Sequence, residues 1–230
     1  MTTFVLIAGS CHGGWWYEPL VAELGKAGHR GVALTLAGLG ADDPVWPVTL
    51  ETHVQEAEAA ASHAGESGVV LVGHSYGGSV ITGVADRIPE RVRALVYLDA
   101  FVPEDGDSCY SMTDEQQRQW YIGGAGQTGF SVQPLPFFDP RARPHPLATL
   151  IQRSRLSGAW RSVAVKHYAA ALQWPGRSPF ADTVQRLRAT PGWQLHDWAT
   201  PHNVMHDGPD RVLELLLEVA AEISASESAE

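Results

Sequence analysis

Cysteine and lysine are scarce in this sequence. Its 230 residues include only two cysteines, Cys11 and Cys109, and only two lysines, Lys26 and Lys166. Two cysteines are too few for a disulfide framework, and the chain has neither a CxxC pair nor a Cys/His spacing typical of zinc sites. Both cysteines are therefore expected to be free thiols in a reducing compartment, with no bound metal.

Long apolar runs and an excess of positive charge are also missing. No run approaches the roughly 18 apolar residues that a membrane helix requires, and the opening stretch MTTFVLIAGS lacks the features of a signal peptide. The formal net charge is −10, whereas phosphate binding requires a basic surface. We therefore expect a cytoplasmic protein that binds neither nucleic acid nor a membrane. Its oligomeric state, a homodimer included, stays open.

The chain does contain an alternation of apolar strands and amphipathic helices. Short apolar runs typical of strands buried on both faces occur at 4–8, 31–36, 69–72 and 92–98. Helical patterns separate these runs, and a similar alternation returns near the C-terminus. The order predicts an α/β fold with a mostly parallel sheet, whose core comprises residues 1–100 and 160–230.

The segment 101–159 interrupts the alternation. It is rich in Pro, Gly, Gln and aromatic residues, and its stretch GGAGQTGFSVQPLPFFDPRARPHP fits neither a regular strand nor a long helix. A disordered linker would leave its aromatic side chains without a core, so we expect an inserted cap or lid, with a short helix that begins after Thr113 as N-cap. The candidate substrate-binding residues are Trp16, Trp120, Tyr121, Phe137 and Phe138.

Gly73-His74-Ser75-Tyr76-Gly77 has the form G-x-S-x-G, after an apolar strand and before a helix of small residues. In this context a sharp turn exposes the serine hydroxyl above the sheet edge. A glycine-rich phosphate loop is the alternative, but that loop requires G-x-x-x-x-G-K-[ST], and no lysine is present here. Ser75 is therefore the candidate nucleophile.

A serine nucleophile needs a base and donors for the negative oxygen that forms on its substrate. His202 lies on a late loop before the C-terminal helix, where a hydrolase base is expected; His196 and His206 are expected to be structural or exposed. The oxyanion donors are expected to be the backbone N–H groups of Tyr76 and of Ser10 or its neighbour, in a first loop that His12 holds by hydrogen bonding.

Three segments carry a resemblance to a known family: FVLIAGSCHGGWWYEPL, VVLVGHSYGGSVITGVADRIPERVRALVYLDAFVPEDG and HNVMHDGPDRVLELL. They resemble the α/β-hydrolase superfamily, and within it the branch of salicylate-binding-type methyl esterases and hydroxynitrile lyases. The resemblance covers roughly residues 4–105 and 190–222. It implies an α/β-hydrolase fold with an inserted cap, Ser75 as nucleophile, His202 as base, and the N–H groups of Ser10 and Tyr76 as oxyanion donors.

The chain departs from that branch at the catalytic acid. The family usually places an aspartate after the strand that precedes the last one, but no carboxylate follows VKHYAAAL until Asp182. Asp99 ends the strand 92–98, where α/β sheets place functional groups. We therefore expect Asp99 to orient His202. The alternatives are that Asp99 only caps the chain at this point, or that Asp197 is the acid.

These residues predict acyl transfer through a serine, which needs no metal or organic cofactor. The expected substrate is a small carboxyl ester, such as a methyl ester or lactone of an apolar or aromatic molecule. Hydroxynitrile lyases of the branch carry a lysine beside the catalytic histidine, and this chain has Asn203 there. A lyase of that type is not expected, but another lyase or cyclase, or a non-catalytic binding protein, stays open.

Overall fold

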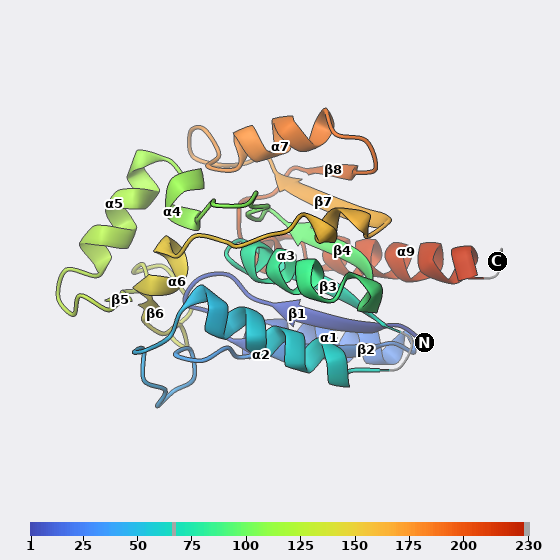
Figure 1. Cartoon of the computed structure of the whole chain (residues 1–230), viewed down its shortest axis with the longest axis horizontal. Coiled ribbons are helices and arrows are strands. Elements are labelled where there is room, and N and C mark those ends of the chain that lie inside the picture. Colours follow the sequence, from blue (N-terminus) through green and yellow to red (C-terminus); the bar gives the residue numbers. More distant parts are fainter. Residues whose placement is uncertain (66–67, 228–230) are drawn as a thin grey trace.

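The computed structural model describes residues 1–65 and 68–227, and its central element is a parallel sheet (Figure 1). The strands are β1 (Thr3–Ile7), β2 (Arg30–Leu34), β3 (Val69–His74), β4 (Val92–Leu98), β7 (Val165–Ala171) and β8 (Gln194–Trp198). Their order is β2-β1-β3-β4-β7-β8, and each neighbouring pair is parallel. The predicted α/β fold is confirmed.

Helices cover both faces of the sheet (Figure 1). One face carries α2 (Leu50–His63), α3 (Gly77–Arg87) and α7 (Ala181–Arg188), and the other carries α1 (Glu18–Lys26) and α9 (Pro209–Glu227). Because successive side chains of a strand point to opposite faces, Val5 of β1 enters the first core and Leu6 enters the second. The segments that connect these strands and helices also contain the shorter helical elements η1 (Gly14–Tyr17), η2 (Pro89–Arg91), η3 (Ala159–Ser162) and α8 (Val204–Asp207).

Local side-chain contacts set the helix ends. Thr49 and Thr52 form a capping box in which each side chain accepts the other's backbone N–H, so α2 begins at Leu50. In the segment between β4 and β7, α5 (Glu115–Gly124) begins after Asp114, whose side chain accepts the N–H of Gln117. The prediction of Thr113 as this N-cap was therefore wrong: Asp114 has the extended backbone of the N-cap, and the Thr113 hydroxyl donates to the Gln117 side chain instead.

The segment between β4 and β7 lies at the left in Figure 1, beyond the carboxyl ends of the strands. It contains α5 together with α4 (Cys109–Met112), β5 (Ser131–Val132), β6 (His145–Pro146) and α6 (Leu147–Ile151). β5 and β6 pair antiparallel as a separate two-stranded sheet. We refer to residues 101–159 as the cap, and its exact limits stay a prediction.

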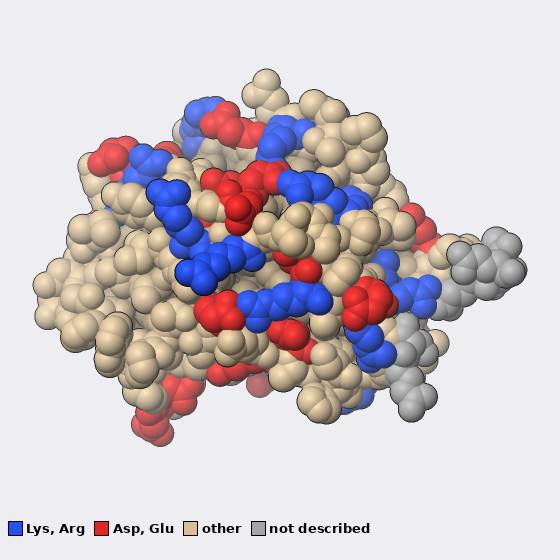
Figure 2. All heavy atoms as spheres, in the orientation of Figure 1, with Lys and Arg blue, Asp and Glu red and all other residues tan. Residues whose placement is uncertain are grey.

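The surface carries intermixed charges. Figure 2 shows acidic and basic side chains side by side over the centre of one face, whereas the left side of this view is largely uncharged. On α3, Arg87 pairs with Glu51 at 2.6 Å and with Glu58 at 3.1 Å on α2. Within residues 1–65 and 68–227, no helix combines the length and the apolar character needed to cross a membrane.

Candidate active site

The order of the strands brings the candidate residues to one edge of the sheet. Ser10 follows β1, Ser75 follows β3, Asp99 follows β4 and His202 follows β8. Because β1, β3, β4, β7 and β8 are consecutive neighbours and all parallel, their carboxyl ends form one edge. Residues that are up to 192 positions apart in the chain therefore share one site.

Ser75 lies on a tight turn between β3 and α3. Its φ is +51°, a left-handed conformation that non-glycine residues adopt only where surrounding contacts enforce it. A Cβ on Gly77 would lie 2.4 Å from the Ile7 carbonyl oxygen, and one on Gly78 would lie 2.1 Å from the Phe101 carbonyl oxygen. Glycine is thus required at both positions, because the start of α3 lies against the chain that follows β1 and β4.

His202 and Asp99 form a direct contact at this edge. His202 Nδ1 lies 2.7 Å from Asp99 Oδ2. An ionised carboxylate can only accept hydrogen bonds, so Nδ1 donates and the Nε2 atom of a neutral imidazole is left to accept a proton. Asp99 has a φ of +44°, so a strained backbone aims this carboxylate as well.

Two further donors hold the Asp99 carboxylate. The Trp174 indole N–H donates to Oδ2 at 2.9 Å, and the Ala171 backbone N–H donates to Oδ1 at 3.2 Å. Asp99 is only 1% exposed, and a buried charge is tolerated when several donors surround it. The Trp174 ring also lies against His202, with centroids 4.7 Å apart. Trp174 belongs to no sequence motif and was not predicted, although it lies in the segment after β7, where the aspartate usual for the family is missing.

His74 connects the Ser75 turn to the His202 loop. Its Nε2–H donates to the His202 carbonyl oxygen at 3.0 Å, and the two rings lie 4.6 Å apart. Within the part of the chain that the structure describes, Ser75 Oγ makes no hydrogen bond. It is therefore not hydrogen-bonded to the His202 imidazole. Such contacts are often long in enzymes without substrate and shorten when it binds.

The alternative acids and bases have other partners. Asp197 pairs with Arg188, and its side chain is 44% exposed. His196 Nε2 lies 3.0 Å from His167 Nδ1, while His206 faces solvent beside Asp207. Asp182 belongs to the first turn of α7 and pairs with Arg177. None of these four candidates contacts Asp99 or His202 within the described residues.

The first loop lies directly against the Ser75 turn. A Cβ on Gly9 would lie 2.7 Å from His74 Nδ1 and 3.1 Å from the Ser75 Cβ, so glycine allows the first loop to come close to Ser75. His12 Nδ1–H donates to the Ser10 carbonyl oxygen at 2.8 Å, as expected for a residue that holds this loop. Burial lowers the pKa of His12, which keeps its ring neutral.

Aromatic side chains extend from this loop to the cap. The Trp16 ring lies 4.7 Å from His74 and 5.2 Å from His12. On the other side of His12, Phe138 lies 5.1 Å away and is followed by Trp120 at 6.0 Å. Of the remaining candidate substrate-binding residues, Tyr121 is buried in the core and Phe137 is 79% exposed. Trp16 and Phe138 are thus the candidates that stand beside the first loop.

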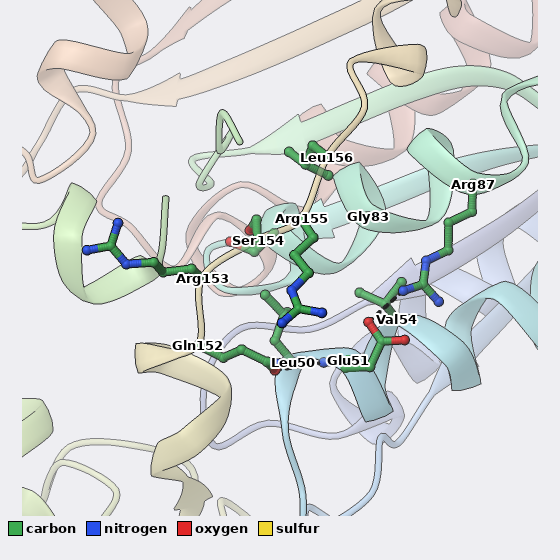
Figure 3. Close-up of a pocket in the computed structure, with 11 residues that line it drawn as sticks. Leu50, Glu51, Val54, Gly83, Arg87, Gln152, Arg153, Ser154, Arg155 and Leu156 are labelled. Atoms are coloured by element: carbon green, nitrogen blue, oxygen red, sulfur yellow. Dashed lines mark hydrogen bonds and ion pairs between the residues drawn. The ribbon is translucent and has the colours of Figure 1, made fainter. Parts of the chain in front are cut away.

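Two cavities lie outside this cluster. One of about 410 Å³, drawn in Figure 3, lies between α2, α3 and residues 152–156, and Arg87, Arg153 and Arg155 are among its lining residues. In Figure 3 the Arg155 side chain extends toward α2, which carries Glu51. The other, of about 330 Å³, borders Asp99 and Trp174 on the side of α7. Ser75 and His202 line neither cavity.

Comparison with known proteins identifies the class of protein. A family model described as "Alpha/beta hydrolase family" matches residues 4–226, so the chain belongs to this family. The predicted resemblance, drawn from three segments of the sequence, is confirmed, and it extends over almost the whole chain.

Individual relatives narrow the class. The chain is 38% identical over 239 residues to a carbendazim hydrolyzing esterase of Nocardioides sp. (strain SG-4G), across 94% of this chain and 98% of that protein. It is 32% identical over 161 residues to salicylic acid-binding protein 2 of Nicotiana tabacum, across 64% of this chain and 60% of that protein. The chain is an ester hydrolase of the α/β-hydrolase fold, as the sequence predicted.

A solved structure agrees on the fold. An extracellular α/β-hydrolase from a Paenibacillus species superimposes with a TM-score of 0.78 at 24% identity, across 95% of this chain and 99% of that one. At this identity the likeness concerns the fold alone, and it includes the cap as well as the sheet because nearly all of both chains is covered.

Proposed function

We propose that this protein hydrolyses a carboxyl ester of a small apolar or aromatic molecule, a methyl ester or a lactone, with Ser75 as nucleophile, His202 as base and Asp99 as acid. The observation that carries the proposal is the 2.7 Å contact between His202 Nδ1 and Asp99 Oδ2 beside the strained Ser75 turn. Similarity to proteins named as esterases and as methylesterase 2 of Arabidopsis thaliana supports the same reaction.

The reaction follows from the positions of these groups. Ser75 Oγ attacks the carbonyl carbon of the ester while His202 Nε2 accepts the hydroxyl proton. The carbonyl oxygen becomes negative and is stabilised by the backbone N–H groups of Ser10 and Tyr76. The carbon–oxygen bond to the alcohol then breaks, and His202 returns its proton to the leaving oxygen. Water, deprotonated by His202, then attacks the acyl carbon; the bond to Ser75 Oγ breaks, the acid leaves, and His202 returns its proton to Oγ.

The surroundings of the first loop favour an apolar substrate. Trp16 and Phe138 flank His12, whose pKa is lowered by burial, so these three rings carry no charge near neutral pH. Asn203, beside His202, is uncharged as well. Uncharged, largely aromatic surroundings of this kind favour an aromatic or aliphatic group over a charged one.

The decisive experiment compares the wild type with Ser75→Ala on a panel of nitrophenyl esters, aromatic methyl esters, lactones and carbendazim. We expect the wild type to release nitrophenol in a burst of about one equivalent, and Ser75→Ala to lower kcat by roughly 10³-fold or more. Turnover by Ser75→Ala at the wild-type rate would contradict the assignment of the nucleophile. Preference within the panel identifies the leaving group.

A further inference from the structure

The cap holds the first loop through the residue that follows Ser10. Cys11 has a φ of +69°, and both of its backbone polar groups are bonded to the cap. Its N–H donates to His145 Nδ1 at 3.1 Å, and its carbonyl oxygen accepts the N–H of Arg143 at 2.9 Å. The position of the Ser10 N–H is therefore set by a segment more than 130 residues away in the sequence.

His145 is fixed in a single protonation state. It is fully buried on β6, and its Nε2–H donates to Thr149 Oγ1 at 2.8 Å, which in turn donates to the Pro146 carbonyl oxygen at 2.8 Å. With Nε2 as donor, Nδ1 is the acceptor that the Cys11 N–H requires. Burial and the neighbouring His53 and His12 hold the pKa of His145 well below its usual range, so the ring stays neutral.

His145 also touches Tyr76, the residue expected to supply the second oxyanion donor. The His145 and Tyr76 rings meet edge to face with centroids 4.7 Å apart. The Tyr76 hydroxyl lies 2.7 Å from His53 Nδ1, and His53 Nε2–H donates to the Ala37 carbonyl oxygen, so the tyrosine donates to His53. The Tyr76 side chain is thus held from two sides.

We propose that His145 is a positioning residue that sets the distance between the two oxyanion donors, the N–H groups of Ser10 and Tyr76. The inference rests on the proposed function, because these donors act on the negative oxygen of the tetrahedral intermediate. Donors must lie about 2.7–3.1 Å from that oxygen, so a small displacement of the first loop weakens binding of the intermediate more than binding of the ester. In this proposal the cap takes part in placing the oxyanion donors.

The test compares His145→Leu with His145→Asn. Leucine fills similar space without an acceptor, whereas the asparagine side-chain oxygen lies near the position of Nδ1 and can accept the Cys11 N–H. We expect His145→Leu to lower kcat by about 10- to 100-fold with KM changed less than about threefold, since one displaced oxyanion donor is at stake. It should weaken inhibition by an aryl boronic acid, whose adduct with Ser75 resembles the intermediate, by a similar factor. His145→Asn should recover most of both.

Equal kcat in His145→Leu and wild type would overturn the inference, and so would a rise in KM alone. If His145→Leu does not fold, His145→Gln replaces it, because its longer side chain carries the amide toward Thr149, whose Oγ1 accepts from the NH₂ group, and leaves no acceptor near the Cys11 N–H. Amide hydrogen exchange at Cys11, measured in the same variants, is a readout that does not depend on catalysis. The Cys11 N–H should exchange at least about tenfold faster in His145→Leu or His145→Gln than in His145→Asn. Equal exchange rates would contradict the proposal. If the wild type shows no ester turnover that depends on Ser75, that result would instead contradict the proposed function.

Discussion

Replacement of Asp99 by asparagine removes the charge of the proposed acid while it keeps the shape of the side chain. Asparagine has nearly the same shape and tolerates the left-handed φ of +44° at this position, so the backbone need not change. The amide cannot satisfy all three donors. If its oxygen faces Trp174 and His202, its NH₂ group faces the Ala171 N–H; if it is reversed, NH₂ faces both Trp174 and His202. Either orientation sets a donor against a donor.

The magnitude follows from the lost charge. In the proposed mechanism His202 becomes an imidazolium, whose charge centre lies about 4 Å from that of a carboxylate bonded to Nδ1. At an effective dielectric constant of roughly 20, two unit charges at that distance attract by about 4 kcal/mol. Since about 1.4 kcal/mol is a factor of ten in rate, Asp99→Asn should lower kcat/KM by about 10³-fold.

The assay is hydrolysis of the nitrophenyl ester that the wild type cleaves fastest, with Asp197→Asn as the matched control. Asp197 is the rival acid, and its half-exposed pair with Arg188 is of a kind that contributes only about 0–1 kcal/mol, so the control should retain near-wild-type kcat/KM. A loss below tenfold in Asp99→Asn, or a larger loss in the control, would refute the reasoning and move the acid elsewhere. Near-UV circular dichroism of both variants verifies that each is folded.

Two further predictions concern the surroundings of the proposed triad. Trp174→Phe keeps an aromatic ring beside His202 but removes the N–H that donates to Asp99. The substitution should lower kcat/KM about tenfold and the free energy of unfolding by about 1–2 kcal/mol. Wild-type values in ester assays and urea titrations would contradict this prediction. Burial lowers the pKa of His53 to about 4 and that of His74 well below its usual range. Because the unfolded chain protonates near the ordinary value of 6.5, stability should fall from pH 6.5 toward pH 5, by up to about 1.4 kcal/mol per pH unit for each buried histidine; urea unfolding free energies that stay constant over this range would contradict the prediction.

Local patterns in the sequence were sufficient for the fold. The apolar run at 69–72, the glycines around Ser75 and the helix that follows are a strand, a turn and a helix within 20 residues, and their spacing is set by steric limits that act over short distances. Alternation of such units predicts a parallel sheet with its functional edge at the carboxyl ends of the strands. Thr113 shows the limit of this reasoning, because two adjacent residues could cap the same helix and only the formed backbone chose Asp114.

The position of the proposed acid could be narrowed from the sequence but not decided there. Asp99 directly follows the apolar strand β4, and Asp197 lies within β8, close to its carboxyl end. Nothing in the spacing of the two residues indicates which strand lies next to the His202 loop. The order β4-β7-β8 answers this, since it puts Asp99, Trp174 and His202 at three adjacent strand ends. Trp174 and His145 were invisible to motif analysis for the same reason: each acts through a hydrogen bond to a residue 75 or 134 positions away.

The sequence by itself determined the class of fold, the strained serine and the late histidine, because these depend on contacts between residues close in the chain. The tertiary structure alone decided that Asp99, rather than Asp197, contacts His202, and that the cap reaches back to Cys11 through His145. Hydrogen bonds of this kind require two groups within about 3 Å, and only the packing of distant strands and loops around a common core brings them that close.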